Sequence, residues 1–147
     1  MVKSIYIASS WRNDVQPQVV EMVKSIGYDV YDFRHPEGVG DGFHWSDIGA
    51  DWLEWSVEEY RQNLSHPIAK EGFRRDYDAM LSCDACVLLL PCGRSAHTEA
   101  GWFAGRGLPV YVLSPVKQEP ELMYALFDGI FASVAELKDF LLRKRQQ

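Results

Sequence analysis

Residues 84–109, DACVLLLPCGRSAHTEAGWFAGRGLP, predict a buried strand, a tight turn and a helix in direct succession. Residues 85–90 are continuously apolar, and the Pro-Cys-Gly that follows them would end a strand. Ser95 is expected to cap a helix over about residues 96–106, in which small side chains permit close packing. In an open parallel sheet, ligands bind beyond the carboxyl ends of the strands. Glu99 is therefore expected in or near the first helical turn, facing that crevice, where a carboxylate could act as a nucleophile.

The alternation of strand and helix extends along the whole chain. Apolar periodicity and turn residues therefore predict an α/β fold, a flavodoxin-like or Rossmann-like three-layer sandwich with a central, mostly parallel five-stranded sheet. Ser56 with Glu59, and Ser133 with Glu136, predict capping boxes at the start of two helices. The expected strands are residues 2–8, 28–33, 85–90, 109–113 and 129–131, and the expected helices are residues 14–26, 56–65, 67–82, 96–106, a short one ending near 127 and a last one opening at 133.

Composition limits the class of protein. A chain of 147 residues, 47% of them hydrophobic, fits a single domain over residues 1–147 with a sizeable core. Its formal net charge of −6 argues against nucleic acid as a partner and favours a small molecule. We find no apolar run long enough to span a membrane and no signal-peptide pattern, so we expect a cytoplasmic protein without membrane contact. The three cysteines are then expected as reduced thiols.

Polar residues follow the first predicted strand. Ser9, Ser10 and Arg12 would lie at the start of the first helix, where hydroxyls, backbone amides and a guanidinium suit a phosphate or a sugar. The alternative is that Ser9, Ser10 and Asn13 only form the turn and cap the helix.

A long loop rich in glycine and aromatic residues is predicted over residues 34–55. Loops longer than about 12–15 residues are often functional. Trp45 in this loop could stack on a nucleobase, or it could simply cover core, as large aromatic side chains commonly do.

Two acidic residues precede the apolar strand, and their positions exclude a shared role. Asp76 and Asp78 lie two positions apart on a predicted helix, so only one of them can point into a site. The alternative is a solvated acidic face paired with Arg74 and Arg75.

A metal site is not expected. Cys83 and Cys86 form a CxxC, and His97 with Glu99 forms an HxE, but zinc deaminases carry their paired cysteines after the HxE. Here all the cysteines precede it, and Cys86 lies within the apolar strand. We therefore expect neither a metal ion nor a cofactor.

The order of these motifs resembles the nucleoside 2-deoxyribosyltransferase superfamily, including its nucleotide N-hydrolase branch. Tyr6 on the first strand, Asp76 before the apolar strand, Ser95-Ala96, and the Glu-Ala-Gly that begins at Glu99 carry the resemblance. It extends over residues 3 to about 133 and is densest over residues 76–113.

The resemblance implies roles for three of these residues. The residue matching Glu99 attacks the anomeric carbon of a nucleoside, the residue matching Asp76 assists proton transfer at the base, and the tyrosine matching Tyr6 orients the glutamate. The chemistry of the residues agrees. An oxocarbenium-like transition state is stabilised and trapped by a carboxylate, and the departing base needs a proton.

The resemblance also bears on the substrate. Where the transferases carry an acidic residue that touches the sugar, this chain has Gly93, and its Ser95 stands one position further from the glutamate than in the transferases. Arg94 and Ser95, together with Arg12 and the serine pair before it, would suit a 5′-phosphate, as in the N-hydrolase branch.

A homo-oligomer is implied by the resemblance, because sites of this family are often completed by a neighbouring subunit. Met123 and Tyr124 would be the residues that reach across.

The sequence thus predicts an enzyme that cleaves the N-glycosidic bond of a nucleoside or nucleoside 5′-monophosphate, by hydrolysis or base transfer, through Glu99. One alternative is an NAD hydrolase like TIR domains, which also use a glutamate. Others are a nucleotide-binding module without turnover, or a flavodoxin-like domain in which Glu99 only stabilises its helix.

Overall fold

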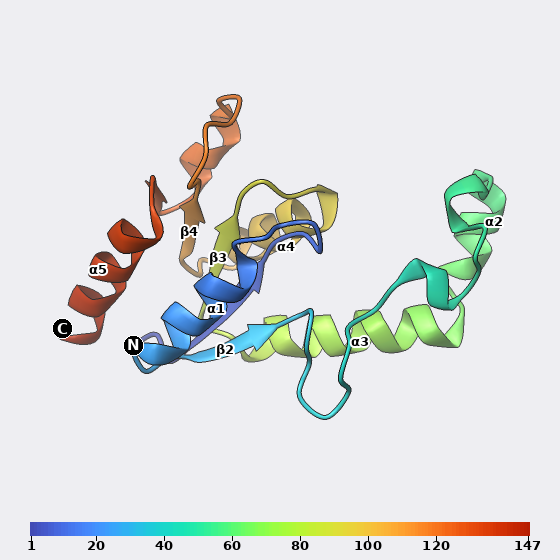
Figure 1. Cartoon of the computed structure of the whole chain (residues 1–147), viewed down its shortest axis with the longest axis horizontal. Coiled ribbons are helices and arrows are strands. Elements are labelled where there is room, and N and C mark those ends of the chain that lie inside the picture. The colour runs from blue at the N-terminus through green and yellow to red at the C-terminus, as the bar shows by residue number, and fades with distance from the viewer. The chain divides into compact units, whose positions relative to one another are not determined.

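The computed structural model describes residues 1–147, and its internal contacts divide the chain into two compact units. One unit comprises Met1–Asp32 with Ser82–Gln147, and the other comprises Phe33–Leu81. The first carries the sheet, and the second carries the aromatic-rich segment (Figure 1). The single domain expected over residues 1–147 stays a prediction.

Five parallel strands form the sheet of the first unit. They lie in the order β2-β1-β3-β4-β5, and every neighbouring pair is parallel. The predicted α/β fold is therefore confirmed, and the sheet is parallel throughout. Chain order reverses direction between β1 and β3, which makes the carboxyl ends of these two strands the topological switch point where such sheets bind ligands. The strands are β1 (Ser4–Ala8), β2 (Asp29–Asp32), β3 (Ala85–Leu89), β4 (Val110–Leu113) and β5 (Gly129–Phe131).

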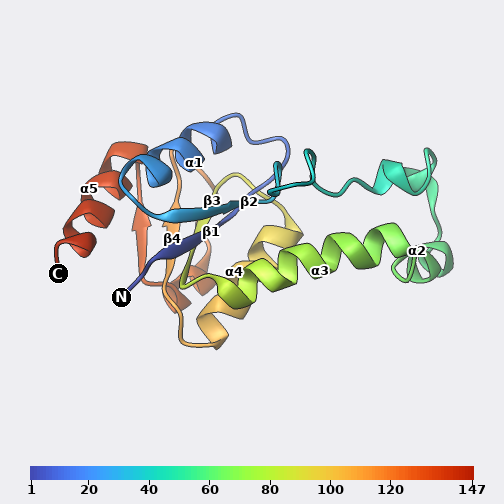
Figure 2. The same ribbon diagram turned by 90° about the horizontal axis from the view of Figure 1, so that it is seen from below.

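Helices cover both faces of this sheet (Figure 2). On one side lie α1 (Gln16–Ser25) and α5 (Val134–Arg145), and on the other lies α4 (Arg94–Gly105). A short 3₁₀ helix, η3 (Leu122–Leu126), connects β4 to β5. These are the three layers that the sequence pattern predicts.

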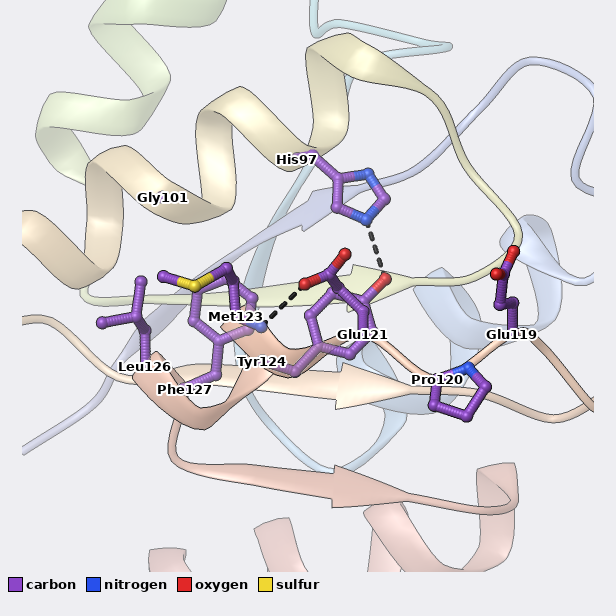
Figure 3. A pocket seen from close by; sticks show the side chains of 9 residues that line it. All are labelled: His97, Gly101, Glu119, Pro120, Glu121, Met123, Tyr124, Leu126 and Phe127. Atoms are coloured by element: carbon purple, nitrogen blue, oxygen red, sulfur yellow. Dashed lines mark hydrogen bonds between the residues drawn. The ribbon is translucent and has the colours of Figure 1, made fainter.

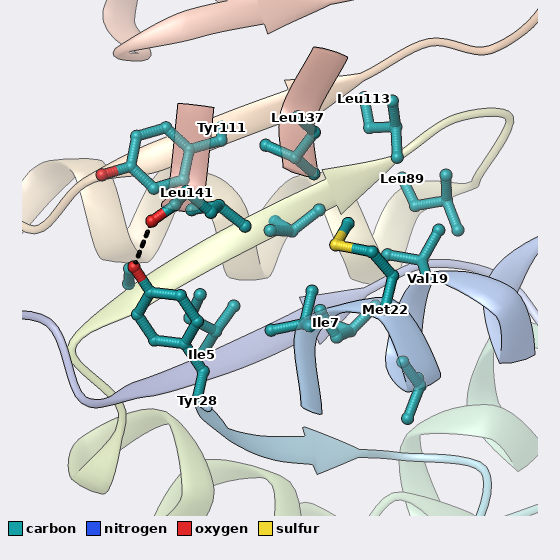
Figure 4. Close-up of a cluster of buried hydrophobic side chains, with 14 of the residues drawn as sticks. Ile5, Ile7, Val19, Met22, Tyr28, Leu89, Tyr111, Leu113, Leu137 and Leu141 are labelled. Carbon is teal, nitrogen blue, oxygen red and sulfur yellow. Dashed lines mark hydrogen bonds between the residues drawn. The ribbon is translucent and has the colours of Figure 1, made fainter. Parts of the chain in front are cut away.

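Alternation along β1 decides which side chains face which layer. Ile5 and Ile7 are buried in the apolar cluster beneath α1 and α5, as Figure 4 shows. Within this cluster the Tyr28 hydroxyl donates to the Leu141 carbonyl at 3.0 Å, so its buried polar atom is satisfied. Tyr6 lies between the two isoleucines and therefore projects from the opposite face, toward α4.

The start of α4 differs from the prediction. The N-cap is Gly93, in extended conformation, and the helix already begins at Arg94, so the expected cap at Ser95 is wrong. Glycine is nearly as good an N-cap as serine, so local preference does not separate the two positions. The earlier start places Glu99 in the second helical turn, where the helix dipole stabilises a carboxylate little. Helix stabilisation alone therefore does not account for this glutamate.

The two predicted capping boxes differ in outcome. The box of Ser56 and Glu59 is complete, with both hydrogen bonds at 3.1 Å. At the start of α5, Ser133 accepts from the Glu136 backbone N–H, but the Glu136 carboxylate accepts from the backbone N–H of Ala132 instead. Only half of the second box forms.

The unit Phe33–Leu81 contains the predicted loop and two helices. Residues 34–55 include two short 3₁₀ helices, η1 (Trp45–Asp47) and η2 (Trp52–Glu54), which the sequence pattern did not indicate. The helices α2 (Val57–Asn63) and α3 (Pro67–Ser82) follow.

No helix of the chain is both long enough and apolar enough to cross a membrane.

Candidate active site

The hydroxyl of Tyr6 donates a hydrogen bond to Oε2 of Glu99. Tyr6 is fully buried on β1, and its ring stacks on Tyr31 at 5.2 Å and contacts Phe103 of α4 at 5.6 Å. Glu99 is half-buried on α4. The structure therefore brings together two predicted site residues that lie 93 positions apart, and ring contacts with Tyr31 and Phe103 hold the Tyr6 side chain that donates this bond.

The charge of Glu99 acts on two thiols. Burial, followed by the negative charge of Glu99, raises the pKa of Cys92 to about 12. The same two causes, in the same order, raise the pKa of Cys86 well above its usual value. Both thiols therefore stay protonated at neutral pH.

Cys83 is also a free, buried thiol, and no three His, Cys, Asp or Glu side chains in the structure are grouped to hold a metal ion.

The turn after β1 is tied to the end of β3. The Ser9 hydroxyl donates to the Leu89 carbonyl at 3.0 Å, and Nδ2 of Asn13 donates to the Pro91 carbonyl at 3.2 Å. Ser10 accepts from the backbone N–H of Arg12 at 3.1 Å. Ser9, Ser10 and Asn13 thus form the turn, but none of them caps α1, whose N-cap is Val15 without a side-chain hydrogen bond. The Arg12 side chain is exposed.

The β3–α4 connection is open. A Cβ on Gly93 would meet no atom within 4 Å, and Gly93 has no side chain that could cap the helix. The first backbone N–H groups of α4 therefore lack both an intrahelical acceptor and a side-chain cap, and such groups favour an anion. Arg94 and Ser95 lie in this first turn and are exposed.

Two further predicted residues belong to the unit Phe33–Leu81. Asp76 is half-buried on α3, whereas Asp78 pairs with Arg74 at 2.9 Å on the exposed surface, so the solvated acidic face predicted as the alternative describes Asp78. Trp45 is half-buried in an aromatic cluster, where its ring meets Phe43, Trp55 and Tyr60 edge-on at 4.8, 5.9 and 6.0 Å. The rings around Trp45 are themselves half-buried or exposed, so its role toward a base and its role in covering core both stay predictions.

Sequence reasoning missed a second pair of residues, His97 and Tyr124 (Figure 3). Nε2 of His97 lies 2.8 Å from the Tyr124 hydroxyl, and the two rings stack at 5.8 Å. Nδ1 of the same ring lies 2.8 Å from the carbonyl of Gly93. The available signal was the spacing of four positions between Gly93 and His97, which lets a helical side chain reach back to a carbonyl one turn earlier.

This pair lies at a groove of about 570 Å³ beside η3. Two residues of α4, His97 and Gly101, form one wall, and Glu119, Pro120, Glu121, Met123, Tyr124, Leu126 and Phe127 form the other. Tyr124 and Met123 therefore line a groove within their own chain.

Comparisons with known proteins establish the fold. No protein-family model matches the chain, and no curated protein is significantly similar in sequence. Among solved structures, a 2-deoxyribosyltransferase from Bacillus psychrosaccharolyticus has a TM-score of 0.61 at 16% identity, over 92% of this chain and 90% of that chain. The CMP N-glycosidase BcmB of Clostridium botulinum has a TM-score of 0.55 at 15% identity, over 95% of this chain and 98% of that chain. A conserved protein from Enterococcus faecalis V583 has a TM-score of 0.60 at 13% identity, over 99% of both chains.

The resemblance predicted from the sequence is confirmed at the level of the fold, because a 2-deoxyribosyltransferase and a CMP N-glycosidase share this fold. Two of the three are enzymes that act on nucleosides or nucleotides.

Proposed function

We propose that this protein is an enzyme that cleaves the N-glycosidic bond of a nucleoside or nucleoside 5′-monophosphate, with Glu99 as its nucleophile. The observation that carries the proposal is the hydrogen bond from the buried Tyr6 hydroxyl to the Glu99 carboxylate, beside the switch point of a parallel sheet. A structural neighbour that is a CMP N-glycosidase and another that is a 2-deoxyribosyltransferase support the same reaction class.

The reaction proceeds in two displacements at the anomeric carbon. One oxygen of Glu99 attacks C1′ while the bond from C1′ to the base nitrogen breaks, and the base leaves with the bonding electron pair. Asp76 is proposed to supply the proton that neutralises the departing base. Water then attacks C1′ of the glycosyl ester while the Asp76 carboxylate takes a proton from it, which releases the sugar and restores both the Glu99 carboxylate and the protonated Asp76. Tyr6 holds the attacking carboxylate in one orientation throughout.

A 5′-phosphate is supported by the charges at the switch point. The open N-terminus of α4 and the exposed guanidinium groups of Arg12 and Arg94 suit an anion, and Ser95 adds a hydroxyl. We also propose that Ser9 and Ser10 contact the substrate and that Trp45 stacks on its base.

Hydrolysis is favoured over transfer to a second base. The position at which the transferases carry a sugar-binding acid is Gly93 here, and a Cβ on it would meet no atom within 4 Å. Water has room at this position.

The resemblance further supports a homo-oligomer, which sedimentation velocity would detect directly.

The test is base release from a panel of nucleosides and their 5′-monophosphates, followed by chromatography. Glu99→Gln should lose at least about 10³-fold in kcat, whereas Glu21→Gln, an exposed glutamate on α1, should match the parent. Mass spectrometry of the quenched reaction should find a glycosyl adduct on the peptide that contains Glu99.

Three outcomes would contradict the proposal. Full activity of Glu99→Gln would exclude Glu99 as the nucleophile. Release of nicotinamide from NAD, without base release from any nucleoside or nucleotide of the panel, would indicate an NAD hydrolase. Tight nucleotide binding in calorimetry with no product at stoichiometric enzyme indicates a binding module.

A further inference from the structure

The turn of residues 91–93, called the 91–93 turn below, is held from two sides. On the side of β1, Asn13 donates to the carbonyl of Pro91 at 3.2 Å. On the side of η3, Nδ1 of His97 lies 2.8 Å from the carbonyl of Gly93, and the backbone N–H of His97 reaches the same oxygen at 3.3 Å. The Cys92 sulfur lies 3.7 Å from the same ring nitrogen. His97 is thus in contact with two of the three residues of the turn.

The hydrogen-bond partners define the state of the His97 ring. A carbonyl oxygen only accepts, so Nδ1 must carry the proton that it donates to Gly93. In the neutral ring Nε2 is then an acceptor, and the Tyr124 hydroxyl donates to it at 2.8 Å. The two rings are nearly parallel, at 16°, and Tyr124 in turn stacks on Phe127 at 5.9 Å. One chain of contacts therefore runs from η3 through His97 to the 91–93 turn, and Figure 3 shows the part of it between Tyr124 and His97.

We propose that His97 is a positioning residue: its bond to the Gly93 carbonyl, with the ring fixed by Tyr124, holds the 91–93 turn in place beside Glu99. The kinetic part of this inference rests on the proposed function, and the structural part does not.

The position of the turn depends on this bond because of the way α4 begins. Gly93 offers no side chain to bond the first N–H groups of the helix, and it has no neighbouring atom within 4 Å of its Cβ position. Neither a cap nor packing therefore restrains it on that side. Glu99 lies on the helix that Gly93 begins, about 1.7 turns further on. A shift of about 1 Å between a substrate and its nucleophile can cost about 100-fold in rate, so a loose turn would disturb catalysis without touching the substrate.

The test compares three variants of the full chain. His97→Asn places an amide nitrogen close to the Nδ1 position and keeps a donor for Gly93, whereas His97→Gln reaches the Nε2 position and keeps only the contact with Tyr124. Thr98→Val is the matched control, because it removes a hydrogen bond of the same kind, from the Thr98 hydroxyl to the Arg94 carbonyl at 2.8 Å, one position along the helix.

The first measurement needs no substrate. Backbone ¹⁵N order parameters of Cys92 and Gly93 should be about 0.85 in the parent, in His97→Asn and in Thr98→Val. In His97→Gln they should fall below about 0.6. The second is steady-state base release. Here kcat should fall about 10-fold to 100-fold in His97→Gln with KM changed less than kcat, and His97→Asn should restore most of it.

The outcomes separate the two proposals. The role of His97 would be overturned if the order parameters of Cys92 and Gly93 stayed high in His97→Gln, or if they fell as far in Thr98→Val. If the parent releases no base, the proposed function fails, and the order parameters still decide whether His97 holds the turn. Increased mobility of the Cys92 and Gly93 amides in His97→Gln with unchanged kcat would support the structural part of the proposal and overturn its kinetic part.

Discussion

Replacing Tyr6 by phenylalanine removes the hydroxyl that donates to Glu99 and leaves the rest of the side chain in place. The ring is fully buried between Tyr31 and Phe103, so the phenylalanine should keep the same position. The variant therefore changes one hydrogen bond to a carboxylate and little else.

The size of the effect follows from the strength of such a bond. A hydrogen bond to a charged group contributes about 1.5–3 kcal/mol. If Tyr6 orients the attacking oxygen in the transition state, its loss should lower kcat about 10-fold to 150-fold. The free energy of unfolding should fall by an amount in the lower half of the range of about 1.5–3 kcal/mol, because Glu99 is half-buried and water can replace part of the lost bond.

The assay is base release together with urea denaturation, and Tyr111→Phe is the matched control. Tyr111 is a buried tyrosine on β4 whose hydroxyl has no hydrogen-bond partner, so its removal should leave kcat unchanged and should not destabilise the fold. A Tyr6→Phe enzyme with the kcat of the parent would refute the orienting role of Tyr6. A loss of kcat as large in Tyr111→Phe would show that the assay responds to general loosening of the sheet.

Other substitutions test the packing and the charges. Gly72→Ala should destabilise the unit Phe33–Leu81 by about 1–2 kcal/mol, measured by denaturation followed with tryptophan fluorescence, because the new Cβ would lie 2.9 Å from that of Phe43 and overpacking outweighs the gain in helix propensity. The backbone N–H groups of Lys3 and Ser4 donate to Asp84 and lower its pKa. The contribution of Asp84 to stability is therefore present above its unfolded pKa of about 3.9 and is lost as the pH falls through its lower folded pKa. Urea midpoints of Asp84→Ser should accordingly depend less on pH below about pH 4 than those of the parent. Cys92, with a pKa raised to about 12 by burial and by the charge of Glu99, should react slowly with iodoacetamide at neutral pH and faster in Glu99→Gln, and an equal rate in both, measured by peptide mass spectrometry, would contradict the electrostatic contact.

The sequence by itself determined the elements and their class. Each predicted strand coincides with an observed one to within two residues at either end, because apolar runs, alternation and turn residues are local signals. The clearest is the continuous apolar run of residues 85–90, which contains the fully buried β3. The parallel sheet followed from the alternation of strands and helices. The candidate nucleophile Glu99 followed from its place after that strand and from the resemblance.

Local signals were weakest where two residues are nearly equivalent. Gly93 and Ser95 are both acceptable N-caps, and only the path of the chain out of β3 selects the glycine. A different limit applies to the 3₁₀ helices at Trp45 and Trp52. They lie among packed aromatic rings, and no sequence period indicates them.

Contacts between distant segments were decided by the tertiary structure alone. Whether the Tyr6 hydroxyl meets Glu99 depends on the register of β1 and β3, in which Tyr6 lies opposite Cys86, and on the rotation of α4 above them. The bond between His97 and Tyr124 likewise depends on where η3 comes to lie. A one-dimensional pattern specifies which face of an element is apolar, but the distance between two polar groups on different elements is set only when those faces have packed together.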